Sequence, residues 1–155
     1  MHKKFTLMSG FTLIELMVAV AIAGILISVG YPAYQGVIKS GYRKSAQSDL
    51  MAFAAAMERH HAGNFTYKGA GAGGSDTGKP GVFASWSPAS EPASEKRYNL
   101  TIVSATGVDY EIKASPVSGS TQAGDGDIYY FSDGRKGWDE NNSGGLDGSE
   151  YCWSC

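Results

Sequence analysis

The 155-residue sequence predicts an α+β fold, in which a long N-terminal α-helix packs on a C-terminal antiparallel β-sheet. Two observations predict this fold. An apolar run over residues 11–29 continues into apolar residues at three- and four-residue spacing, and short alternating segments separated by turns begin near residue 98. We divide the chain into a leader (1–10), a helix (11–62) and a globular head (63–155).

The first half of the helix has the length and composition of a membrane span. Residues 11–29 contain four residues that are not strongly apolar, and at about 1.5 Å per residue they extend roughly 28 Å, close to the hydrocarbon thickness of a bilayer. Lys3 and Lys4 precede the run, so the positive-inside rule places the amino terminus in the cytoplasm and the head outside the membrane. We expect residues 11–31 to form the membrane span.

A single motif joins the leader to the helix. Residues 3–16 read KKFTLMSGFTLIEL, a basic leader that ends in glycine and is followed by a carboxylate five residues later. This motif closely resembles the class III signal of type IV prepilins. The resemblance implies cleavage after Gly10, methylation of the new amino-terminal Phe11, a role for Glu15 in filament assembly, and the ladle-shaped pilin fold.

Glu15 is also unusual on physical grounds. A carboxylate in a membrane segment costs about 2.5–3.5 kcal/mol, so it needs a partner or a function. Cleavage after Gly10 would create a partner, a free amine on Phe11 that is largely protonated at neutral pH. If Glu15 meets that amine on a neighbouring subunit, the pair fixes the axial register. The alternative is an uncleaved anchor whose carboxylate reaches the lipid headgroups.

The helix is expected to continue past Pro32 as an amphipathic segment whose apolar stripe packs on the sheet. Pro32 removes one helical hydrogen bond and is expected to kink the helix of a lone subunit. In type IVa pilins the corresponding segment loses helicity on assembly, and the resemblance implies the same here. The residues that mark this remodelling segment are Gly24, Gly30 and Pro32.

The head begins with an irregular connection over residues 63–97, rich in glycine and proline. The sheet is expected over residues 98–138, with strands at 98–103, 109–115, 127–132 and 136–138. A further strand is expected near residues 151–153.

A twelve-residue segment near the carboxyl end, residues 139–150, fits the order of a calcium-binding loop. Hard oxygen donors recur at alternate positions, and a glycine stands at position six, where the chain turns around the ion. We expect calcium to hold the C-terminal loop in place; the alternative is an ordinary acidic, glycine-rich turn. The expected ligands are Asp139, Asn141, Ser143, Gly145, Asp147 and Glu150.

The two cysteines, Cys152 and Cys155, are expected to form a structural disulfide, which suits an oxidising exterior. Type IV pilins usually carry a long-range cysteine pair, and this pair would close only a small ring. One alternative is a redox pair, because CxxC is the thioredoxin spacing, although the tail lacks the βαβ setting of that chemistry. Another is a zinc site shared with His60 and His61.

No catalytic constellation is found, and we predict that the chain is not an enzyme. The net charge of −2 and the absence of a basic tract indicate no specific nucleic-acid site. The resemblance implies a major or minor subunit of a type IV pilus that serves adhesion, twitching motility or DNA uptake. The implied partners are other pilin subunits, the prepilin peptidase/N-methyltransferase and an inner-membrane assembly platform.

The implied location is the inner membrane before assembly, with a periplasmic head, and then the extracellular pilus. The alternative function is a pseudopilin of a type II secretion system, since major pseudopilins also bind calcium late in the head. Pseudopilins usually have an Asn-Gly-Tyr-Pro segment after the helix. Residues 63–67 here read GNFTY and lead into a long loop without a proline after the tyrosine, which favours the pilus.

Overall fold

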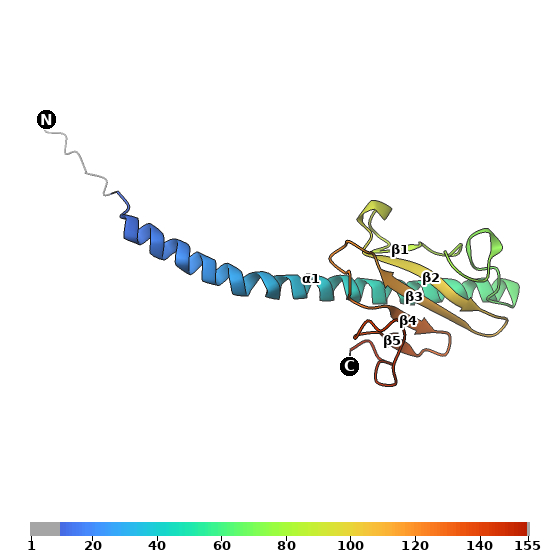
Figure 1. The fold of residues 1–155 in the computed structure, drawn as a ribbon. Helices are drawn as coiled ribbons and strands as arrows, with labels where there is room; N and C mark the ends of the chain where they lie inside the picture. The colour runs from blue at the N-terminus through green and yellow to red at the C-terminus, as the bar shows by residue number, and fades with distance from the viewer. Residues whose placement is uncertain (1–9, 155) are drawn as a thin grey trace, which may run out of the picture. The chain divides into compact units, whose positions relative to one another are not determined.

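The structure, a computed structural model, describes residues 10–154. It contains one long helix, α1 (Leu13–Asn64), and a five-stranded antiparallel sheet in the order β1-β2-β3-β4-β5 (Figure 1). The chain divides into two compact units, one up to Ile38 and one from Lys39 onward. The fold is therefore the expected α+β arrangement of a long helix and an antiparallel sheet.

The sheet is a meander in which each strand pairs with the next along the chain. Its strands are β1 (Trp86–Ser87), β2 (Tyr98–Ala105), β3 (Tyr110–Pro116), β4 (Ile128–Phe131) and β5 (Lys136–Trp138). A bulge between Ile102 and Ser104 shifts the register of β2 against β3. Strand β1 was not expected from the sequence. The strand expected at 151–153 is absent, because that segment bends and its Trp153 packs against Tyr130 at 6.0 Å.

One hydrophobic core lies between the head part of α1 and one face of the sheet. On the sheet side, β2 and β3 alternate, so that Leu100 pairs with Ala114 and Ile102 with Ile112 on the buried face. On the helix side the buried residues recur every three or four positions, as expected for an amphipathic stripe. They are Ala46, Leu50, Phe53, Ala54 and Met57.

Residues 65–97 form the irregular connection and close onto the sheet through backbone bonds. It contains two short 3₁₀ turns, Ala72–Gly74 and Ala93–Glu95, besides β1. Gly78 and Ile102 exchange two backbone hydrogen bonds at 2.8 Å, which covers the edge of β2 beyond β1. Helix α1 is continuous through Gly24, Gly30 and Pro32. The loss of helicity that we expect there on filament assembly stays a prediction.

Candidate functional site

Helix α1 begins just after the expected processing junction. Gly10, Phe11 and Thr12 precede the first helical residue, Leu13. Thr12 caps the helix, because its Oγ1 accepts a hydrogen bond from the Glu15 N–H at 3.3 Å. The spacing Thr-x-x-Glu is a capping-box signal, which predicts this helix start from the sequence. The Gly10–Phe11 peptide bond therefore lies in non-helical chain.

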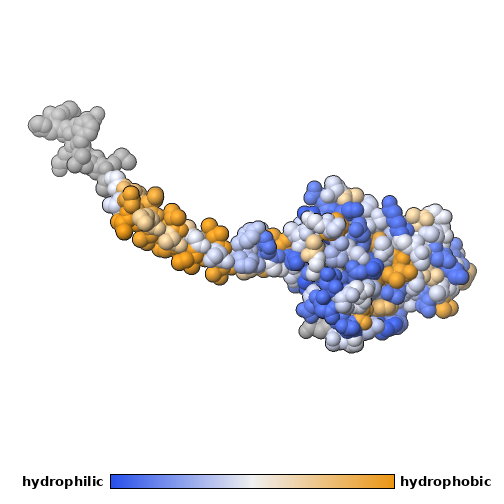
Figure 2. Space-filling model, viewed as in Figure 1, coloured by the Kyte–Doolittle hydropathy of each residue, from blue (hydrophilic) through white to orange (hydrophobic). Residues whose placement is uncertain are grey.

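Glu15 lies in the first turn of an otherwise uncharged helical surface. The next charged residue is Lys39, and every residue from Leu16 to Val37 is exposed. Figure 2 shows this segment as a largely hydrophobic stretch of α1. Its most apolar 18-residue window has a mean hydropathy of 2.5 and is long enough to cross a membrane. Such a surface needs lipid or other helices around it.

The apolar surface of α1 follows the basic leader in the sequence. Lys3 and Lys4 lie outside the described residues. Within the described residues, the helix dipole favours the Glu15 carboxylate, because it lies in the first turn of α1.

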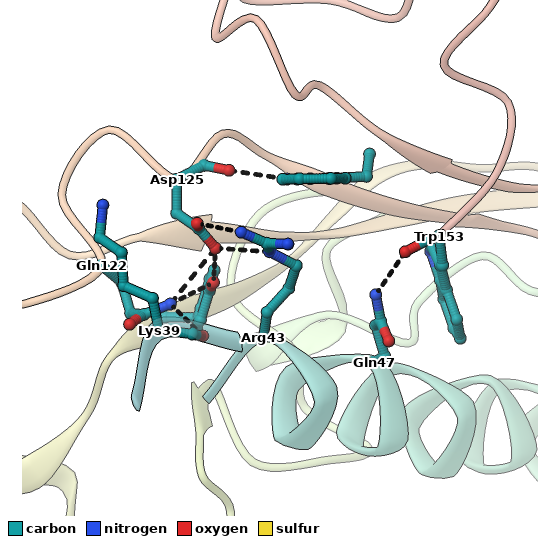
Figure 3. Close-up of polar contacts among 8 residues, drawn as sticks. Lys39, Arg43, Gln47, Gln122, Asp125 and Trp153 are labelled. Atoms are coloured by element: carbon teal, nitrogen blue, oxygen red, sulfur yellow. Dashed lines mark hydrogen bonds and ion pairs between the residues drawn. The ribbon is translucent and has the colours of Figure 1, made fainter. Parts of the chain in front are cut away.

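A buried polar cluster fixes the start of the head. The Arg43 guanidinium on α1 donates two hydrogen bonds to the Asp125 carboxylate, at 2.9 Å and 2.5 Å, and stacks over the Trp138 ring at 3.7 Å (Figure 3). The hydroxyl of Tyr98 donates to the same carboxylate at 2.6 Å, and Gln122 donates to the Lys39 carbonyl at 3.1 Å. These bonds tie the loop before β4 to the helix.

The cluster perturbs its own titratable groups. The hydrogen bond to Asp125 raises the pKa of Arg43. The pKa of Tyr98 is raised mainly by burial and, to a lesser extent, by its hydrogen bond to the same carboxylate. Sequence reasoning did not find this pair, since 82 positions separate Arg43 from Asp125 and no local pattern links them.

The loop of residues 139–150 is closed by its own backbone. The carboxylates of its first and last residues, Asp139 and Glu150, are buried. Four loop amides donate to these two carboxylates at 2.8–3.2 Å: those of Asn141, Ser143, Gly144 and Asp147. The loop also packs on the sheet, because Leu146 lies against Gly137 of β5.

The loop is not a ready-made metal site in this structure. Among residues 10–154, no group of three or more His, Cys, Asp or Glu side chains is placed to hold a metal ion. Asp139 and Glu150 nevertheless have no cationic side chain as a partner within that range. The two carboxylates are instead met by backbone amides and, at 3.5 Å, by the Ser143 hydroxyl of the same loop.

The expected disulfide stays a prediction, whereas the position of the carboxyl-terminal tail argues against the zinc alternative. Cys152 is half-buried, and Cys155, its expected partner, lies outside the described residues. The His60 ring donates a hydrogen bond to the Lys68 carbonyl at 2.9 Å, near the end of α1, and His61 stacks on Tyr67. The tail instead meets α1 at Gln47, about 20 Å earlier along the helix. The described members of the expected zinc site, His60, His61 and Cys152, therefore do not lie together.

Comparison with known proteins decides the family. A model described as "Type IV minor pilin ComP, DNA uptake sequence receptor" matches residues 32–126, and the prokaryotic N-terminal methylation motif matches residues 6–31. The chain belongs to the type IV pilins. It is 32% identical over 130 residues to the type IV major pilin protein PilE of Neisseria gonorrhoeae, covering 81% of this pilin and 74% of that relative. No solved structure matches this pilin.

Family membership identifies this pilin as a structural subunit of a type IV pilus. Other pilin subunits and the prepilin-processing enzyme are its implied partners. The methylation motif and the apolar part of α1 fit a membrane-anchored precursor that later enters a pilus. The match to the minor-pilin model stops at residue 126, so the acidic loop and the cysteine tail lie beyond it.

Proposed function

We propose that this pilin is cleaved after Gly10 and enters the pilus through α1, where Glu15 pairs with the Phe11 amine of a neighbour. The observation that carries this proposal is the position of Glu15, the single charge on an exposed apolar surface that reaches to Val37. Packing such surfaces together removes water from Glu15, so its charge requires a cationic partner.

The processing step fits the local conformation. Protease active sites bind extended chain, and the Gly10–Phe11 bond precedes the helix cap at Thr12. Cleavage places a positively charged amine on the residue just before the cap. A stagger between subunits that separates this amine from Glu15 leaves two unpaired charges in an apolar environment, so the pair selects one register.

The test is Glu15→Ala in the native host. We expect sheared pili to fall below detection while full-length precursor and cleaved pilin persist in the membrane fraction. Glu95→Ala, which removes an exposed head carboxylate, is the control and should leave piliation unchanged. Normal piliation by the Glu15→Ala variant would contradict the proposal. Mass spectrometry of wild-type pili should find methylated Phe11 at the amino terminus, and a retained leader would contradict the processing step.

The proposed location separates a pilus from a secretion pseudopilus. Antibody against the head should label long surface filaments on intact cells. Labelling that requires permeabilised outer membranes would instead identify a periplasmic pseudopilin.

We also propose that residues 139–150 bind calcium and stabilise the C-terminal part of the head. Support comes from the two buried carboxylates that lack cationic partners, and from the donor chemistry of the loop. Bound calcium would supply divalent charge to these oxygens. The donors are the side chains of Asp139, Asn141, Ser143, Asp147 and Glu150 and the carbonyl of Gly145.

Calorimetry on the full chain in detergent tests the calcium proposal. We expect calcium to bind with one site per chain and to raise the melting temperature, with magnesium binding more weakly. Asp147→Ala, an exposed loop residue, should weaken binding without unfolding the protein, whereas Asp76→Ala outside the loop should not. The absence of binding heat and of a thermal shift would refute the calcium site.

DNA capture is a second candidate function, favoured by one observation. The family model that matches most of the head is described as a DNA uptake sequence receptor. Purified pilin in detergent should then retard a labelled DNA duplex in a gel, with affinity that falls as salt rises. Unretarded DNA at low salt would exclude this candidate.

A further inference from the structure

A shallow hollow of about 380 Å³ lies beside the first two strands of the sheet. Strand β2 forms its floor, and the connection before β1 and the turn before β2 form its walls. Its polar and aromatic lining consists of Lys79, Ser85, Trp86, Lys96, Asn99 and Thr101.

Most polar side chains of this hollow have no hydrogen-bond or ion-pair partner within the described protein. Within residues 10–154, the side chains of Lys79, Ser85, Lys96 and Asn99 make no hydrogen bond or ion pair. The Thr101 hydroxyl is buried there without a partner. The other four side chains are exposed or half-buried, so their polar groups are accessible to a ligand from solution.

The other hollows of the head differ in this respect. In the hollow between β3 and β4, Asp109 accepts a hydrogen bond from Thr106, and Asp133 is paired with Arg135 at 2.6 Å. In the hollow beside the tail, Lys136 lies over the Trp153 ring at 4.8 Å. Most of their charged groups are already occupied within the protein; the exceptions are Glu111 and Lys44, whose side chains make no hydrogen bond or ion pair within residues 10–154.

Trp86 gives the hollow an oriented aromatic wall. Its Nε1 donates to the Glu91 carbonyl at 2.9 Å, which satisfies the indole and fixes the ring. Trp86 stands opposite Asn99 in the β1–β2 register, and Thr101 follows two residues along β2, so the three side chains share one face of the sheet. This is the face opposite the core, because Leu100 and Ile102 are buried on the other side.

We propose that this hollow binds an acidic saccharide, a sugar unit that carries a carboxylate or sulfate group. The apolar face of a sugar ring stacks on the Trp86 indole. The Asn99 amide hydrogen-bonds a hydroxyl group of the sugar, and the ammonium groups of Lys79 and Lys96 bind the acidic group.

Charge favours a short acidic sugar over a nucleic acid. The hollow supplies two cations, whereas after Gly10 the chain has fifteen acidic and eleven basic side chains. Glu91 and Glu95 lie next to the hollow in the sequence, so a long polyanion would meet these carboxylates. Duplex or single-stranded DNA requires several phosphates to be neutralised in a row. The inference goes beyond the subunit role, because such a site would let the head contact a glycosylated surface.

Isothermal calorimetry on the full chain in detergent micelles tests the proposal with sialyllactose and a sulfated heparin disaccharide as probes. We expect one of these acidic saccharides to bind, and neutral lactose to bind at least roughly tenfold more weakly, since it lacks the charge-assisted bonds. The variant Lys79→Gln/Lys96→Gln should lose roughly tenfold in affinity, and Trp86→Ala should lose binding.

The lysine variant keeps the test decisive if Trp86→Ala fails to fold, because both ammonium groups are unpaired in the protein. Lys68→Gln, which removes an exposed lysine outside the hollow, is the control and should bind as the wild type does. The proposal is overturned if neither acidic saccharide binds or if the lysine variant binds them equally well. It is also overturned if an oligonucleotide displaces the saccharide and depends on the same lysines.

Discussion

The Asp125 carboxylate accepts hydrogen bonds from more side chains than any other carboxylate described in the head. Its side chain accepts from Arg43, Tyr98 and Gln122, and its backbone carbonyl accepts from the Trp138 indole at 2.7 Å. Only 3% of its side chain is exposed, against 21% for Arg43. Its charge is therefore balanced by one residue of α1.

The first prediction concerns this pair. Asp125→Asn should destabilise the head by about 3 kcal/mol, because it leaves the Arg43 guanidinium without its buried counter-charge. Urea unfolding followed by circular dichroism measures the change. Asp133→Asn breaks the exposed pair with Arg135, and we expect no measurable change for it. Equal stabilities of the two variants would contradict this account of Asp125.

The second prediction concerns alkaline stability. Burial, followed by the nearby Asp127, raises the pKa of Tyr129 to about 12, and burial also raises the pKa of Tyr110. Because the folded state holds these protons more tightly, the associated stability is present below the unfolded pKa near 10 and is lost as pH rises toward 12. Absorbance titration should show a late group of tyrosines that ionise together with loss of the fold, and ionisation of all tyrosines near pH 10 would contradict it.

At the scale of the elements, the end of α1 is strained. Phe65 follows the last helical residue with φ 57°, a left-handed conformation that glycine normally adopts at this position. Its N–H donates to the His61 carbonyl at 2.7 Å, which closes the helix end. The side chain is 85% exposed, so burial does not compensate for the strain.

The third prediction follows from that strain. Phe65→Gly should stabilise the head by about 1 kcal/mol, because glycine adopts the left-handed conformation without steric cost. Thermal melting of the two proteins measures the difference. Val108→Gly removes a side chain of similar exposure, 83%, at a position without positive φ, and it should give no gain. An unchanged melting temperature for Phe65→Gly would contradict the assignment of strain.

The regular elements were largely predictable, because their signals are local. The helix follows from its apolar periodicity, and β2 and β3 follow from alternation. Strand β1 is two residues long, too short for any alternation. The tail around Trp153 has strand-forming residues, but the Trp153 indole and backbone carbonyl hold it in place without strand pairing. The Arg43–Asp125 pair and the hollow beside Trp86 were not predictable, since both depend on segments brought together by the fold.

At the scale of the whole molecule, α1 has two environments along its length. From Lys39 onward it buries a stripe against the sheet, and before Ile38 its surface is exposed. The residues expected to remodel, Gly24, Gly30 and Pro32, lie entirely in the exposed part.

The fourth prediction concerns this remodelling. Amide hydrogen exchange over residues 28–32 should be faster in assembled pili than in the detergent-solubilised subunit, because we expect the helix to open there on assembly. Residues 50–57 of the buried stripe are the internal reference and should exchange slowly in both states. Equally slow exchange over residues 28–32 in both states would contradict remodelling.

The two edge strands of the sheet, β1 and β5, offer few sites for strand pairing between molecules. Strand β1 has two residues and β5 has three, and the Trp138 N–H of β5 already donates to the Glu150 carbonyl at 3.0 Å. Short, capped borders offer little unpaired backbone to another chain. We therefore expect heads at high local concentration to resist amyloid-like pairing through the edges of their sheets.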